Sequence, residues 1–103
     1  MGKNEYIKAL TRFKKALSKE KRIEKLIFFG SRATGKAGKD SDIDLIVVSP
    51  SFRGMKYGRS IGLRKYWDLP YPVDFLCYTP EEFSEKAKRI TIVREAIKEG
   101  VEI

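Results

Sequence analysis

The chain has 103 residues, of which 42% are hydrophobic, and this suits one modest core, so we expect a single domain over residues 1–103. Lys and Arg number 22 against 14 Asp and Glu, and the formal net charge of +8 favours polyanionic partners such as nucleotides, nucleic acids or an acidic protein face. One cysteine and no histidine exclude an internal disulfide, histidine-based catalysis and the usual zinc ligands, so any metal must be held by oxygen.

The N-terminus lacks the uninterrupted apolar stretch of a secretory signal. No segment approaches the roughly 20 apolar residues that a membrane span requires. We therefore expect a soluble, cytoplasmic protein with no membrane partner.

Residues 5–19 predict the first helix, because large apolar side chains recur there at helical spacing while most basic ones fall elsewhere. Asn4 is expected to cap it. Residues 26–29 form a short apolar run that ends at Gly30, as expected for a strand buried on both faces. Residues 30–41 are rich in Gly, Ser and Lys and lie between two of the most hydrophobic segments, which predicts a ligand-binding loop.

Residues 43–48 predict a second strand, closed by Ser49-Pro50 because proline cannot continue a central ladder. A helix is expected around residues 59–67 and a third strand at 73–78. The sequence Thr79-Pro80-Glu81-Glu82 predicts a helix start with a capping box. A last helix at 92–99 is expected to end with Gly100 in the left-handed conformation, followed by an extended piece. The fold class is therefore α/β (α+β), with a short mixed sheet flanked by helices.

Three aspartates are the candidates for chemistry. Asp42 and Asp44 are two residues apart at the start of the second strand, so their side chains project from the same face of the sheet. Carboxylates that close repel one another unless a cation lies between them, and oxygen ligands suit Mg²⁺. Asp74 lies in the third strand, and if that strand neighbours the second, its carboxylate could reach the metal and accept the proton of an acceptor hydroxyl.

Gly30-Ser31 directly follows the first strand, where backbone N–H groups and a hydroxyl can face an anion such as phosphate. Mg²⁺ bridges carboxylates and phosphate oxygens in phosphoryl-transfer sites, commonly as two ions. The glycine-serine turn and the aspartate pair therefore fit one reaction. Taken separately, each has an ordinary structural explanation, a capped turn for the first and solvated charges at a strand edge for the second.

The segment GSRATGKAGKDSDIDLIVVS, followed by Asp74 on a later strand, resembles the signature of the DNA polymerase beta nucleotidyltransferase superfamily. The likeness extends from the first helix through Gly100-Val101, and it is closest to the minimal MNT antitoxins that are paired with HEPN toxins. The resemblance implies a polymerase-beta-like nucleotidyltransferase fold in which Asp42 and Asp44 ligate both Mg²⁺ ions and Asp74 completes the metal site.

The same resemblance implies that Gly30 and Ser31 bind the triphosphate. Arg32 is retained from the family pattern and could contact a phosphate oxygen. Thr34 stands where the family usually has a second arginine, which weakens the expected phosphate or acceptor contacts of that turn.

As function, the resemblance implies transfer of AMP from ATP, or from another nucleoside triphosphate, to a tyrosine hydroxyl of a HEPN-type toxin, which silences its ribonuclease. One alternative is a binding module that neutralises the toxin by contact alone. Another is a small basic nucleic-acid-binding protein, suggested by the charge and the aromatic residues between Tyr57 and Tyr71, although it leaves the aspartate pair unexplained. A homo- or hetero-oligomer remains open, because so short a chain can need a partner to cover apolar surface.

Overall fold

The computed structural model of the chain describes residues 2–36, 38, 41–89 and 91–103. In this part of the chain four strands form one mixed sheet in the order β3-β2-β1-β4. The strands are β1 (Lys25–Phe29), β2 (Ile43–Val48), β3 (Val73–Tyr78) and β4 (Val101–Glu102). β2 and β3 are parallel, whereas β1 is antiparallel to both β2 and β4. The predicted fold class is confirmed, and so is the position of the third strand beside the second.

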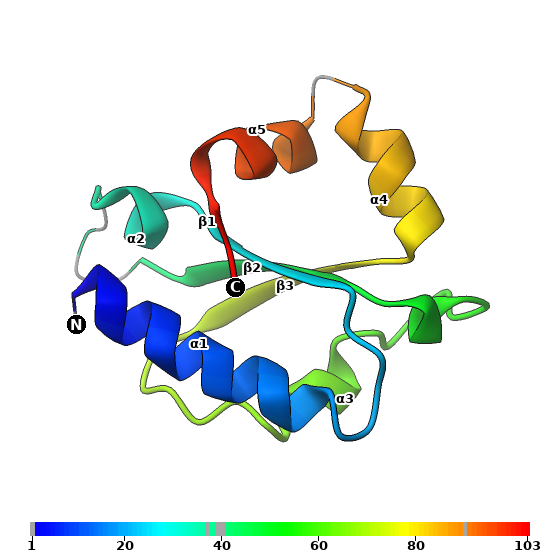
Figure 1. Cartoon of the computed structure of the whole chain (residues 1–103), viewed down its shortest axis with the longest axis horizontal. Coiled ribbons are helices and arrows are strands. Elements are labelled where there is room, and N and C mark those ends of the chain that lie inside the picture. Colours follow the sequence, from blue (N-terminus) through cyan, green and yellow to red (C-terminus); the bar gives the residue numbers. More distant parts are fainter. Residues whose placement is uncertain (1, 37, 39–40, 90) are drawn as a thin grey trace.

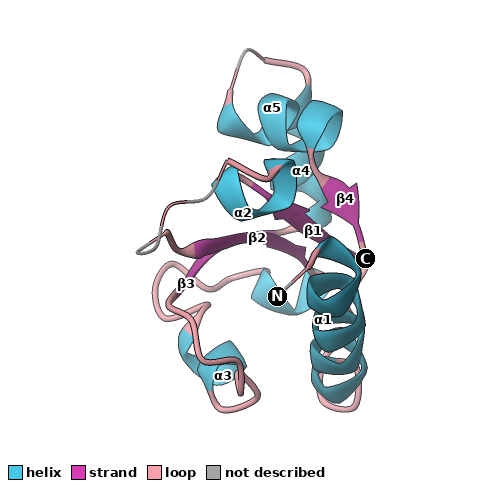
Figure 2. Cartoon of the chain, turned by 90° about the vertical axis from the view of Figure 1, so that its left-hand side faces the viewer, coloured by secondary structure: helices cyan, strands magenta, loops and turns pink. Residues whose placement is uncertain are grey.

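Helices cover both faces of the sheet (Figure 1). α1 and α3 lie on one face and α4 and α5 on the other, as the turned view also shows (Figure 2). The helical segments are α1 (Lys3–Leu17), α2 (Ser31–Thr34), the 3₁₀ turn η1 (Pro50–Phe52), α3 (Ile61–Arg64), α4 (Pro80–Ala87) and α5 (Ile92–Glu99). None of the helices in these described residues has the length and apolar character that crossing a bilayer would need.

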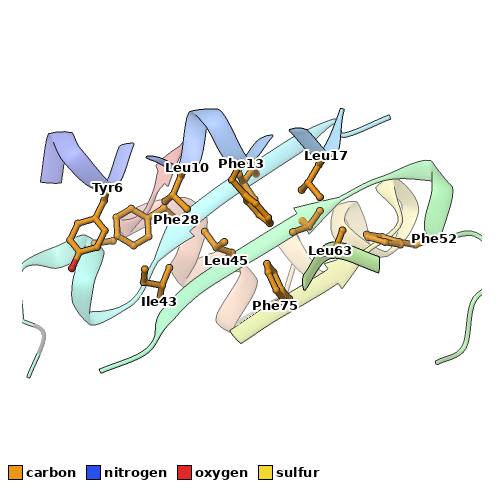
Figure 3. Packing of buried hydrophobic residues seen from close by; sticks show 13 residues of the cluster. Tyr6, Leu10, Phe13, Leu17, Phe28, Ile43, Leu45, Phe52, Leu63 and Phe75 are labelled. Atoms are coloured by element: carbon orange, nitrogen blue, oxygen red, sulfur yellow. The ribbon is translucent and has the colours of Figure 1, made fainter. Parts of the chain in front are cut away.

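The larger core cluster fills the space between the sheet and α1 (Figure 3). α1 contributes one apolar stripe because its large side chains recur every three or four residues. Phe13 packs edge-on against Trp67 and nearly parallel to Phe75, with ring centroids 5.2 and 5.9 Å apart. The most buried members on the two sides are Leu10, Leu17, Leu26, Phe28, Ile43, Leu45 and Val47.

A smaller cluster lies on the other face, under α4 and α5. Because side chains alternate along a strand, Leu45 and Val47 point toward α1 while Ile46 and Val48 join the α4–α5 side. The same alternation places Asp44 on the α4–α5 face. Burial therefore fixes which way this carboxylate points.

The predicted start of α4 is confirmed. The Thr79 hydroxyl accepts a hydrogen bond from the Glu82 backbone N–H at 3.1 Å, and the Glu82 carboxylate accepts one from the Thr79 N–H at 2.8 Å. Pro80 occupies the first turn, where its missing N–H costs nothing. This reciprocal capping orients α4 on the end of β3.

Several predicted details are wrong. Asn4 does not cap α1, because the helix begins at Lys3 and the Gly2 carbonyl accepts from the Tyr6 N–H at 3.1 Å to close the first turn. The helix expected at 59–67 is confined to Ile61–Arg64. The loop expected at 30–41 opens with the one-turn helix α2, and residues 37, 39 and 40 of that loop lie outside the described residues.

Gly100 is also not left-handed, since its φ of −86° and ψ of −177° are extended. Glycine is needed at this position because there is no room for a side chain. A Cβ there would collide with the Ala96 carbonyl oxygen and approach the Phe28 carbonyl oxygen to 2.7 Å. The residue lets the end of α5 approach the backbone of β1, after which Val101 pairs with Phe28. The predicted extended piece is thereby confirmed as the edge strand β4.

Candidate functional site

The strand registers place two of the three predicted aspartates side by side. Asp44 on β2 faces Asp74 on the parallel strand β3 and Phe29 on the antiparallel strand β1. Phe29, Asp44 and Asp74 all lie on the α4–α5 face of the sheet. For Asp74 this follows from its neighbours on β3, Val73 and Phe75, which pack toward α1, because successive side chains of a strand point to opposite faces. Asp42 lies two residues before Asp44, so along an extended backbone its side chain belongs to the same face. The three aspartates thus lie at the end of the sheet where β2 and β3 begin and β1 ends.

Gly30 lies directly against the Asp44 carboxylate. A Cβ built on Gly30 would collide with Asp44 Oδ2 and lie 3.1 Å from Asp44 Cγ. Its φ of 82° and ψ of −165° belong to a backbone region that only glycine adopts readily. Both the conformation and the close approach therefore require glycine, and the predicted turn and the predicted carboxylates meet here.

Electrostatics identify Asp44 as the central carboxylate. Burial raises its pKa above the ordinary aspartate value, and the negative charges of Asp74 and then Asp42 raise it further. Asp44 is half-buried, whereas Asp42 and Asp74 are exposed. A divalent cation would relieve this crowding of negative charge, so the donor set fits Mg²⁺ in its chemistry.

The carboxylates do not form a finished cation site. Among the described residues, no three Asp, Glu, His or Cys side chains lie close enough together to hold a metal ion as they stand. Asp42 and Asp74 are exposed, whereas the half-buried Asp44 side chain lies against Gly30.

Arg32, the predicted phosphate contact, is tied to other parts of the protein. Its Nε donates to the Ser41 carbonyl oxygen at 2.6 Å and its Nη1 donates to the Tyr6 hydroxyl at 2.9 Å. The guanidinium carbon lies 4.5 Å from the centre of the Tyr71 ring, in cation–π contact. Arg32 thus links α2 to α1 and to the segments that enter β2 and β3.

Sequence reasoning missed Tyr6 and Ser41, and it considered Tyr71 only among the aromatic residues of a nucleic-acid-binding surface. Tyr6 occupies a core position of α1 beside Phe28, at the end of the cluster in Figure 3. A tyrosine on the apolar face of a helix carries a hydroxyl that needs a partner when buried, and that need was the available signal. The neighbouring Tyr6 side chain also raises the pKa of Tyr71.

Cys77 is poorly suited to act as a nucleophile. Burial raises the pKa of its thiol to about 11, so the reactive thiolate is scarce near neutral pH. The thiol lies on β3 but on the α1 face, opposite to the aspartates. It takes no part in the candidate site.

Comparison with known proteins agrees with this geometry. No protein of curated function matches the sequence. The structure of a provisionally assigned nucleotidyltransferase from Sulfolobus solfataricus, determined at 1.40 Å resolution, aligns with a TM-score of 0.67 over 97% of this chain and 80% of that chain. Its sequence identity of 20% makes this a likeness of fold. A second provisionally assigned nucleotidyltransferase reaches only 0.47 over 81% of this chain and 88% of that chain, at 21% identity.

The family comparison covers most of the chain. Residues 10–99 match the nucleotidyltransferase domain, and this range contains all the strands that carry the aspartates together with the Gly30-Ser31 turn. The fold, the Gly30-Ser31 turn and the neighbouring aspartates Asp44 and Asp74 are consistent with this match. The chain belongs to the nucleotidyltransferase domain family.

Proposed function

We propose that the chain acts as a single minimal nucleotidyltransferase domain that moves AMP from ATP, with Mg²⁺, to a hydroxyl group of a partner protein. The hydroxyl oxygen would bond to the α-phosphorus as the bond between the α- and β-phosphates breaks, and pyrophosphate would leave. The observation that carries the proposal is the contact of Gly30 with Asp44 in a row with Asp74. A phosphate-binding turn and paired carboxylates are the two parts that phosphoryl transfer needs side by side.

In this proposal Asp42, Asp44 and Asp74 hold the metal, as the family resemblance implies. When bound, Mg²⁺ would neutralise phosphate charge and lower the pKa of an attacking hydroxyl. The Gly30-Ser31 turn would hold the triphosphate against the carboxylates, and Asp74 would accept the proton of the acceptor. The main contribution of the chain would then be to orient the reactants and balance their charge.

The exposure of the site supports a large acceptor. Asp42 and Asp74 are open to solvent on the surface where the strands begin. A hydroxyl on the surface of another protein can reach such a position, whereas a small acceptor is usually enclosed in a cleft. The resemblance to MNT antitoxins makes a HEPN-type toxin the proposed partner, with transfer to it as the silencing step.

The test is transfer of labelled AMP from ATP with Mg²⁺ to the protein encoded by the neighbouring gene. We expect Asp42→Asn combined with Asp44→Asn to reduce labelling by at least about 100-fold, because several kcal/mol of metal-dependent stabilisation is lost. A matched control is Glu24→Gln with Glu81→Gln, which removes two exposed carboxylates at the opposite ends of β2 and β3. Undiminished labelling by the aspartate variant would contradict the proposal.

A second candidate function is silencing of the partner by contact alone. The observation that favours it is that, in the described residues, the carboxylates are not assembled as a three-ligand metal site. A binder of this kind would inhibit the partner without ATP and leave it unmodified. Mass spectrometry of the partner after incubation, with and without ATP, separates the two candidates.

A further inference from the structure

Arg32 belongs to a closed set of contacts around the segment that carries Asp42. Arg32 Nε bonds the Ser41 carbonyl oxygen at 2.6 Å on one side of Asp42. On the other side, the Ile43 backbone N–H donates to the Pro72 carbonyl oxygen at 2.9 Å. Asp42 is therefore the one residue between two anchored neighbours.

Tyr71 closes this set of contacts. It precedes Pro72 in the chain, and its ring lies under the Arg32 guanidinium at 4.5 Å. The contacts thus form a closed path: Arg32 contacts Ser41, Ile43 contacts Pro72, and Tyr71 contacts Arg32. Since Asp74 follows Pro72 by two residues, the same contacts join the entries to β2 and β3, where both exposed aspartates stand.

Tyr6 fixes the guanidinium itself. Its side chain is 5% exposed, its ring packs 5.5 Å from Phe28 and 5.8 Å from Tyr71, and its hydroxyl accepts from Arg32 Nη1 at 2.9 Å. A planar guanidinium held by two hydrogen bonds and one aromatic face has little freedom to follow a ligand. Two of its five N–H groups, the one on Nε and one of the two on Nη1, are used by these bonds.

We propose that Arg32 is a positioning residue, which holds the backbone under Asp42 through Ser41 and is itself held by Tyr6 and Tyr71, rather than a phosphate ligand. The inference rests on the proposed function, because it concerns the same carboxylate site. It separates Arg32 from Gly30 and Ser31, with which it shares the family motif. It also extends the site to Tyr6 on α1, 26 residues earlier in the chain.

Tyr6→Phe is the decisive variant, because it removes only the hydroxyl and leaves the ring packing on Phe28. Residues that orient metal ligands typically change metal affinity or activity by 10- to 100-fold. We expect Tyr6→Phe and Arg32→Lys to lower kcat by about 10-fold or more while KM for ATP stays nearly constant. A phosphate-binding Arg32 predicts the reverse, a raised KM in Arg32→Lys and no effect of Tyr6→Phe. The matched control is Tyr66→Phe, which removes a hydroxyl beside Glu20, beyond the C-terminal end of α1, and which we expect to be silent.

The affinity for Mn²⁺ of the nucleotide-free protein, measured by electron paramagnetic resonance, should change in opposite directions for the two roles of Arg32. Removing a free positive charge near a cation site tightens cation binding, because repulsion is lost. Removing a positioning residue loosens it. We therefore expect Arg32→Ala to bind Mn²⁺ about 10-fold more weakly than the unmodified chain. Tighter or unchanged binding would overturn the inference.

Hydrogen exchange keeps the test independent of activity. The Ile43 amide, which bonds Pro72, should exchange about tenfold faster in Tyr6→Phe, whereas the Phe83 amide on α4 should be unchanged. If the unmodified chain neither binds Mn²⁺ nor transfers AMP, the proposed function fails and the exchange rates still decide the role of Arg32. If the unmodified chain is active and Ile43 protection is the same in every variant, the positioning role alone fails.

Discussion

Gly30 shows how one residue couples backbone conformation to chemistry. The chain turns there with a φ of 82°, and the missing side chain makes room for the Asp44 carboxylate. Gly35, five residues later, has nearly the same φ of 80°, but a Cβ there would meet nothing within 4 Å. The two glycines bound α2 and form a natural pair for comparison.

We predict that Gly35→Ala costs about 1–2 kcal/mol of unfolding free energy from backbone strain alone. Gly30→Ala should cost about 2–4 kcal/mol, because a glycine-only conformation and a collision with Asp44 are added. AMP transfer, measured at a temperature where both variants are folded, should fall about 100-fold in Gly30→Ala only, since misplacement by about 1 Å is that costly. Equal transfer by the two variants would show that Asp44 can move without consequence. Urea denaturation gives the stability comparison.

At the scale of elements, the start of α4 joins three segments. The Arg59 guanidinium bonds both oxygens of the Glu82 carboxylate at 2.5 and 3.2 Å, and also donates to the Cys77 carbonyl oxygen on β3 at 3.1 Å. Glu82 in turn completes the capping box with Thr79. The bond to Cys77 occupies one backbone acceptor on the edge strand β3, which otherwise could pair with another chain.

The pH dependence of stability should report this junction. The Arg59 guanidinium, then the Thr79 N–H, hold the pKa of Glu82 at about 2, below its ordinary value near 4.5. A lowered folded-state pKa stabilises the protein above the unfolded value, and this contribution is lost as pH falls from about 4.5 to about 2. Glu82→Gln should therefore lose less stability than the unmodified chain between pH 5 and pH 2.5, as measured by urea midpoints.

Glu85→Gln is the control for this experiment. Its ion pair with Arg89 is exposed on both sides, and such pairs contribute little. It should follow the unmodified chain across the same pH range. An identical acid response of Glu82→Gln and Glu85→Gln would contradict a special role for the Arg59–Glu82 pair.

The elements that sequence predicted best are those whose signals are local. Three elements have the predicted bounds: the strands at 43–48 and 73–78 and the last helix at 92–99. Their signals are apolar runs with nearby prolines and the Thr79 cap, all of which can be read within a few residues of the sequence. The role of Gly100 was misjudged because it depends on the approach of β1, which lies some 70 residues earlier in sequence. The contact of Arg32 with Tyr6 was likewise hidden, since a helix pattern presents Tyr6 only as core.

At the scale of the whole molecule, the candidate site depends on topology. The aspartates come together because the chain crosses over between β2 and β3 and lays them parallel in register, with Asp44 opposite Asp74. Sequence motifs gave the residue types and the order of the strands along the chain. The pairing register of β2 with β3, which are separated by 24 residues, follows from packing on both faces of the sheet. The sequence alone therefore supports the approach of Asp74 to Asp44 only on the condition that the two strands are neighbours.

Net charge is the other property of the whole molecule. Lys8, Arg12 and Lys15 recur every three or four residues on the exposed side of α1, opposite its buried stripe, and Lys19 continues the row beyond the helix. None of the four takes part in an ion pair within the described residues. Like charges at this spacing repel by a few tenths of a kcal/mol per pair, and they add to the self-repulsion of a chain with a net charge of +8.

Arg12→Glu should therefore stabilise the protein, although it changes an exposed residue far from the core. It replaces two repulsions, with Lys8 and Lys15, by two attractions and should raise the unfolding free energy by about 0.5–1 kcal/mol at low ionic strength. The gain should shrink in 1 M salt, where the Debye length falls to about 3 Å. Arg12→Gln, which only removes the charge, should give about half the gain, and urea denaturation of the three proteins at both salt concentrations measures the series. A gain that persists in 1 M salt would mean that helix propensity, rather than repulsion along α1, is responsible.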